Sequence, residues 1–181
     1  MQRMYVWLPL ALLLAVALVL LGGVGVASAS SSLFAKGGEP VCTVTSTSSS
    51  SSSTTCTATL SQKNRDSRLR ADVDVSGFAV FQCQTSTGST TAGQNQVQVY
   101  ANQSNTPIPL GATTFTTSPA VLNAPATVSA QAAGCPTGST VGNPTLTTTS
   151  ISFRTDNGSI MSFPCTASNP NGLSGTVPLS C

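Results

Sequence analysis

Residues 69–83, LRADVDVSGFAVFQC, decide the fold that we expect of this chain. The first half alternates apolar with mostly charged side chains, the period of two that is typical of a β-strand with one solvated face. Its apolar positions are Leu69, Ala71, Val73 and Val75. Residues 78–83 are largely apolar on both faces, which predicts a central strand covered from both sides. Ser76-Gly77 between the halves favours a bulge or a turn.

Other short strands are predicted along the rest of the chain, with no helical periodicity after residue 37. They lie at residues 41–44, 55–60, 95–101, 113–117, 126–132 and 145–149. Together with residues 69–83 and a hairpin at 151–163, this makes about eight to ten strands. The pattern predicts an all-β fold, an antiparallel β-sandwich of immunoglobulin-like or related topology, with a barrel as the alternative. Trp7, the single tryptophan, lies in the N-terminal segment, so the core tryptophan of true immunoglobulin domains is missing.

Two hairpins are predicted from local pattern. The tract 45–54 is wholly serine and threonine and lies between two alternating runs, so we expect a long polar loop there, either flexible or O-glycosylated. Asn157-Gly158 lies between two further alternating runs, which favours a type I′ turn. Asn102-Gln103-Ser104, at the end of the 95–101 strand, and Asn157-Gly158-Ser159 are N-glycosylation sequons, so Asn102 and Asn157 are candidate glycan sites in exposed loops.

Six cysteines are spread through the part of the chain that follows the N-terminal segment. They are Cys42, Cys56, Cys83, Cys135, Cys165 and Cys181. An even number in an exported domain predicts three disulfides, although sequence alone leaves 15 pairings open. Pairing of the strands on either side of the serine tract would bring Cys42 close to Cys56. Cys181 is expected to tie down the end of the chain, with a free thiol as the alternative.

The N-terminal segment carries no charge from Met4 to Val26 and directs the rest of the chain across a membrane. Residues 1–29 are either a signal peptide, cleaved after Ala27-Ser28-Ala29, or a retained helix whose residues 5–26 are long enough to span a bilayer or to enter a filament core. Residues 30–40 are predicted to be a linker and residues 41–181 a disulfide-stapled ectodomain. The expected location is therefore extracellular or on the cell surface, with or without an N-terminal anchor.

Composition argues against several classes of function. Charged residues make up only 7% of the chain, the net charge is +2, and no basic run occurs, so nucleic acid is not an expected partner. The chain has no histidine, which removes the base that a Ser-His or Cys-His pair needs. Phosphate-binding and haem motifs are also missing, so we expect no cofactor. Without histidine or a CxxC pair, a metal site is not expected either.

The few carboxylates offer two further alternatives. Asp72 and Asp74 would suit calcium, but successive same-face positions on a strand favour a cross-strand ion pair or a charged sheet edge. Asp74 and Asp156 could form the carboxylate pair of a glycosidase, although nothing in the sequence brings them together. The sequence therefore predicts a protein that is not an enzyme.

An uncharged N-terminal helix joined to a Ser/Thr-rich β-sandwich with sequons resembles the type IV pilin-like subunits of archaeal surface filaments. The resemblance implies that helices bundle in a filament core and that the sandwiches form a glycosylated sheath. The processing site of that family is not evident, since Arg3 is followed by Met4. In a filament assembled after signal cleavage, Ser30 to Val44 would instead suit a strand donated to the next subunit.

The sequence thus predicts a self-associating, non-catalytic structural subunit of an extracellular filament or cell-surface coat. One alternative is a single-span accessory subunit of a membrane complex with its β domain outside. A further alternative is a secreted adhesin or carbohydrate-binding module.

Overall fold

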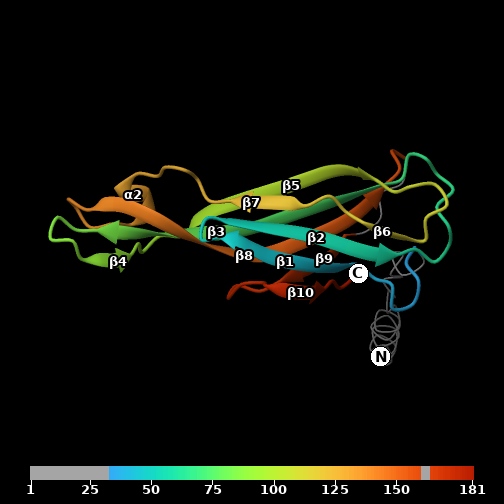
Figure 1. Ribbon diagram of the computed structural model, residues 1–181, viewed down its shortest axis with the longest axis horizontal. Helices are drawn as coiled ribbons and strands as arrows, with labels where there is room; N and C mark the ends of the chain where they lie inside the picture. Colours follow the sequence, from blue (N-terminus) through green and yellow to red (C-terminus); the bar gives the residue numbers. More distant parts are fainter. Residues whose placement is uncertain (1–32, 160–163) are drawn as a thin grey trace, which may run out of the picture.

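The computed structural model describes residues 33–159 and 164–181, and it confirms a mostly antiparallel β-structure in two sheets (Figure 1). The predicted N-terminal hydrophobic helix lies outside the described residues. Within the described residues, no helix is both long enough and apolar enough to cross a membrane.

The first sheet is built around the serine-rich hairpin. Its order is β10 (Gly175–Pro178), β1 (Val41–Ser48), β2 (Ser51–Thr59), and then β6 (Thr114–Thr116) and β7 (Ala120–Asn123), which pair with different parts of the same edge of β2. All these pairings are antiparallel. The first sheet therefore combines a local hairpin with strands from the middle and the end of the chain.

The second sheet is built around β3 (Arg70–Gln84). β8 (Thr140–Asp156) pairs along one edge of β3, and β9 (Cys165–Ser168) pairs with β8 in turn. The other edge of β3 pairs with β5 (Val97–Pro107) and β4 (Thr90–Ala92). The prediction of a central strand is therefore confirmed, and the register with β8 shifts between Ser76 and Gly77, where a bulge was expected.

Alternation continues along the whole of β3. Ala79, Phe81 and Cys83 are buried, whereas Phe78 and Val80 on the other face are only partly buried. The prediction that residues 78–83 are covered from both sides is therefore wrong for the face that carries Phe78 and Val80. The reason is that the second sheet has its packed core on one side, and its other side remains partly open to solvent.

The core lies between the two sheets. Phe153 of β8 contacts the ring of Phe34 at 6.1 Å between centroids and that of Phe115 at 6.2 Å. Val73 of β3 and Leu122 of β7 are buried in the same cluster. Fully burying a side chain of this size stabilises a fold by about 1.5–3 kcal/mol. The two sheets are therefore held together by one apolar layer, as in a sandwich.

The packed domain begins inside the stretch that was predicted to be a linker. Phe34 is 3% exposed and forms a β-bridge with Leu60, and the N–H of Ala35 donates to the carbonyl of Thr59 at 2.9 Å. Pro40 is buried as well. The described domain therefore starts no later than Leu33, because Phe34, within a largely polar stretch, is buried in the core.

The Ser/Thr tract forms strands rather than a long loop. β1 runs to Ser48 and β2 starts at Ser51, so the connection is short. Small hydroxyl side chains fit a strand because every second one can be buried in the core if its hydroxyl group forms a hydrogen bond there. Ser52 is buried and shares a 3.0 Å hydrogen bond with Thr148 of the other sheet. The outward residues of the tract alternate with these buried ones.

Two other local predictions are wrong. Residues 126–132 form no strand; the short helix α2 (Ala130–Ala133) starts there, with Ser129 as its N-cap and Gly134 at a left-handed φ of 69° after it. A two-residue turn at Asn157-Gly158 would also place Phe153 opposite Ser162. The structure pairs Phe153 with Cys165, three residues later, so the connection between β8 and β9 is longer than predicted. The part of that hairpin at residues 160–163 lies outside the described residues.

A smaller unit extends from one end of the sandwich. We call it the distal extension: β4, α2, and the ends of β3 and β8 beside them. Ala79, Phe81 and Ala133 form its own apolar cluster. Figure 1 shows this extension at the left, opposite the end where residues 33–40 join the body. The domain is therefore elongated, with chemically different ends.

Candidate functional site

All the charged side chains of the described residues belong to three short segments, 36–39, 63–74 and 154–156. The charged residues are Lys36, Glu39, Lys63, Arg65, Asp66, Arg68, Arg70, Asp72, Asp74, Arg154 and Asp156. No charged residue occurs between Asp74 and Arg154 in the sequence. Pairing of β3 with β8 sets Arg70 opposite Asp156 and Asp72 opposite Arg154. The backbone N–H of Ser61 donates to the carbonyl of Leu33 at 2.9 Å, which joins the first two segments. The fold therefore brings the three segments to the end where residues 33–40 join (Figure 1), which we call the charged end.

Within the charged end, the aspartate carboxylates are engaged by neighbouring groups. Arg154 Nε lies 3.2 Å from Asp72 Oδ2, which confirms the expected cross-strand ion pair. The backbone N–H of Arg68 and then its guanidinium donate to Asp66, and these hydrogen bonds lower the pKa of that carboxyl below its usual value. In the described parts of the chain, no three potential ligands gather in a way that could hold a metal ion.

Asp74 and Asp156 are not brought together. Both lie on the outer face of the second sheet, but their register partners on β8 and β3 place them four residues apart along the strands. This separation is about 13 Å at 3.3 Å per residue. The two carboxyl groups of glycosidases lie roughly 5–9.5 Å apart. The structure therefore gives no support to a glycosidase pair.

The two sequon asparagines have different settings. Asn102 is exposed but lies within β5 instead of in a loop after it, and its Nδ2 donates to Asp74 Oδ1 at 2.6 Å. Asn157 follows β8 and is partly buried, with Nδ2 donating to Asp66 Oδ2 at 3.0 Å. β5 pairs with β3 on one side only, so it is an edge strand. An edge strand tolerates proline, which lacks an N–H to donate, and β5 can therefore extend to Pro107.

A groove of about 510 Å³ lies on the outer face of the second sheet beside Asn102. Two cross-strand rows form its floor: Tyr100, Ser76 and Ser150 in one, and Asn102, Asp74 and Ser152 in the other. Tyr100 is 77% exposed, so most of its surface is open to solvent. Sequence reasoning missed this site, although an aromatic residue on the polar side of a strand, two residues before a sequon, was a usable signal.

Six cysteines form three disulfides, and no cysteine is free within the described residues. Cys42–Cys56 joins facing residues of β1 and β2, which confirms the predicted pair. Cys165–Cys181 ties the last residue to β9, as expected of a staple, so the free-thiol alternative is wrong.

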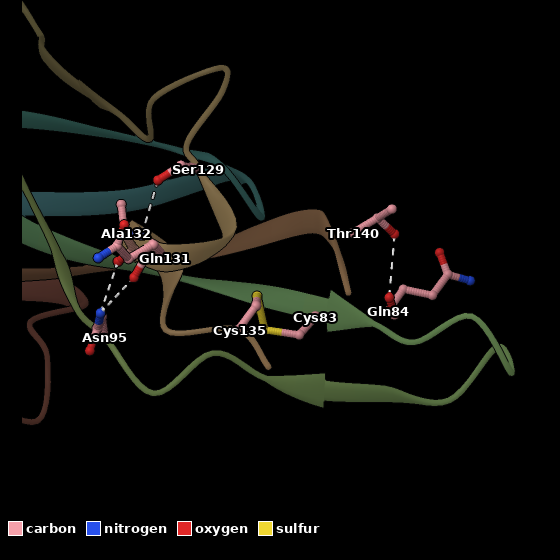
Figure 2. Close-up of a disulfide and its surroundings, with 8 residues drawn as sticks. All are labelled: Cys83, Gln84, Asn95, Ser129, Gln131, Ala132, Cys135 and Thr140. Atoms are coloured by element: carbon pink, nitrogen blue, oxygen red, sulfur yellow. Dashed lines mark hydrogen bonds between the residues drawn. A yellow bond between two sulfur atoms is a disulfide. The ribbon is translucent and has the colours of Figure 1, made fainter. Parts of the chain in front are cut away.

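The third disulfide, Cys83–Cys135, joins the end of β3 to the segment after α2 (Figure 2). Beside it, the Nδ2 of Asn95 donates to the carbonyls of Gln131 and Ala132 at 3.1 and 3.2 Å. These contacts bind α2 and the segment after it to β3 and to the loop between β4 and β5. The distal extension is therefore fixed covalently and by hydrogen bonds although its apolar cluster is small.

The segment predicted as a donated strand, Ser30 to Val44, is described from Leu33 onward. Its described part ends in β1, which lies in its own sheet between β2 and β10. Cys42 within it is bonded to Cys56 of the same chain. Donation of this segment to a neighbouring subunit would therefore require β1 to leave its own sheet.

Comparisons of this chain with protein-family models, with curated proteins and with solved structures found no match.

Proposed function

We propose that this chain is a non-catalytic structural subunit of an extracellular filament or cell-surface coat, attached through its N-terminal segment. The observation that carries the proposal is the separation of charge. All charged groups of the described residues lie at the end that residues 33–40 join, and the distal extension has none. A surface of hydroxyls and amides faces outward, and it suits close packing of copies because no like charges repel each other there.

The short connection to the N-terminal segment supports this orientation. Six residues lie between Val26, the last residue of the apolar stretch, and Leu33, where the described domain begins, so the two are seven residue steps apart. At 3.3–3.6 Å per residue, these seven steps span at most roughly 25 Å. A retained helix would therefore hold the charged end close to the membrane or filament core and direct the distal extension away from it.

The fold and the disulfides fit an exported module. We infer an immunoglobulin-like strand order: β1, β2 and the β6/β7 edge correspond to the first, second and fifth strands of one sheet, and β5, β3, β8 and β9 to the other, with β10 added beside β1. Three disulfides are typical of proteins outside the reducing cytosol. A non-catalytic role is supported by the absence of histidine from the chain and by the distance between Asp74 and Asp156.

Electron microscopy of surface preparations from the source cells, together with mass spectrometry of the material, tests the proposal. We expect polymers or a lattice in which this chain is the main component, with an N-terminus at or before the apolar stretch. A monomer in the membrane that co-purifies with another protein at fixed stoichiometry would instead support the accessory-subunit alternative. A mature chain that starts at Ser30 and stays monomeric in the medium would contradict both.

A further inference from the structure

The groove on the outer face of the second sheet combines an exposed aromatic residue with a carboxylate and three serine hydroxyl groups. Tyr100 is 77% exposed and is one of the residues that line the groove. Asp74 lies beside it on the central strand, and Ser76, Ser150 and Ser152 supply hydroxyl groups around both. The volume of about 510 Å³ is within the roughly 300–1,000 Å³ of small-molecule sites.

These groups match the chemistry of a sugar ring. A pyranose has one face of C–H groups, which can lie on an aromatic ring, and a rim of hydroxyl groups that donate and accept hydrogen bonds. A carboxylate offers about four acceptor positions. In the described residues, Asp74 receives one side-chain hydrogen bond, from Asn102 to Oδ1, so Oδ2 remains available for ligand hydroxyl groups.

We propose that this groove binds a neutral saccharide, with the sugar ring on Tyr100 and its hydroxyl groups on Asp74 and on the three serines of the groove floor. Neutral sugars are favoured because Asp74 is the one charged residue among those that line the groove. The inference is independent of whether the chain polymerises, because it rests on the outer face of the sheet alone.

The saccharide can come from two sources. One is a glycan on Asn102, which lies two residues after Tyr100 on the same face of β5. In that case the bond from sugar C1 to a lipid pyrophosphate donor breaks, C1 bonds to Asn102 Nδ2, Nδ2 loses one proton, and the lipid pyrophosphate leaves. Nδ2 keeps one N–H for Asp74. The other source is a free oligosaccharide or a sugar chain on another molecule.

The chain has two tyrosines, Tyr5 and Tyr100, which makes tyrosine labelling a simple test. Full-length chain with 13C-labelled tyrosine rings is prepared in a detergent without sugar headgroups. Unglycosylated chain is titrated with maltose and with N,N′-diacetylchitobiose as probes. In the second arm, chain from a host with N-glycosylation is compared with its Asn102→Gln variant. We expect the Tyr100 signal to move in at least one arm while the Tyr5 signal stays unchanged.

The variants separate recognition from folding. Tyr100→Ser should weaken probe binding about tenfold by calorimetry, whereas Tyr100→Phe, which keeps the ring, should change it less than about threefold. Asp74→Asn should also weaken binding. Because Tyr100 is mostly exposed, the Ser variant should keep the wild-type melting temperature.

A shift with the probes alone identifies a free saccharide, and a shift that Asn102→Gln abolishes identifies the glycan of the chain itself. An unmoved Tyr100 signal in both arms would overturn the proposal. So would probe binding that Tyr100→Ser leaves unchanged.

Discussion

Phe34→Ala tests whether the domain begins inside the stretch that resembles a linker. The Phe34 side chain is 3% exposed, and its ring lies 6.1 Å from that of Phe153 between centroids. Truncation removes the transfer free energy of a nearly whole aromatic side chain and leaves a cavity between the sheets. The expected loss in the free energy of unfolding is about 3–5 kcal/mol. Domains of ordinary size have only about 5–15 kcal/mol in total.

The assay is thermal unfolding of the full chain in neutral detergent, followed by far-ultraviolet circular dichroism. For a domain of this size, the loss corresponds to a fall in Tm of roughly 6–20 °C. Lys36→Ala is the matched control because Lys36 is exposed and two residues away. The control should change stability by no more than about 0.5 kcal/mol. If Phe34→Ala unfolds within about 2 °C of the control, residues 33–40 are a linker and the core assignment fails.

Three further predictions follow from named contacts. Replacing Cys83 and Cys135 together with alanine should cost about 4 kcal/mol in urea denaturation, because their disulfide closes a sequence separation of 52 residues. Gly77→Ala should cost about 1–3 kcal/mol, since a Cβ would overlap a backbone carbonyl of β8, whereas Gly142→Ala, whose Cβ would find its nearest neighbour at 3.5 Å, should be close to neutral in the same assay. The lowered pKa of Asp66 means that its carboxylate stabilises the fold above the unfolded pKa of about 3.9 and loses that effect as the pH falls through the folded pKa. The melting temperature, measured across this pH range, should depend less on pH for Asp66→Asn than for the wild type.

Local pattern predicted much of the fold correctly. The alternation in residues 69–83 predicted the strand that became the centre of the second sheet. Cys42 and Cys56 could be paired because the two strands that carry them are neighbours in sequence. Residues 126–132 were mistaken for a strand because their small and β-branched side chains do not distinguish a strand from a short capped helix turn.

The candidate site was predicted only in part. Asn102 was identified because a sequon is a local signal. Tyr100, Asp74 and Ser152 belong to three strands, so nothing in a sequence window shows that they share one groove. The register that unites them is set by long-range strand pairing.

The sequence by itself determined the all-β class, the number of disulfides and the low content of charged residues. Period-two patterns, the cysteine count and the composition can all be read without knowing which strands pair. Only the tertiary structure decided that Phe34 belongs to the core and that the charges meet at one end. It also decided that Cys83 pairs with Cys135. The physical reason is that each of these features depends on which distant strands pair and in which register, and that choice is made by burying the apolar faces of both sheets together.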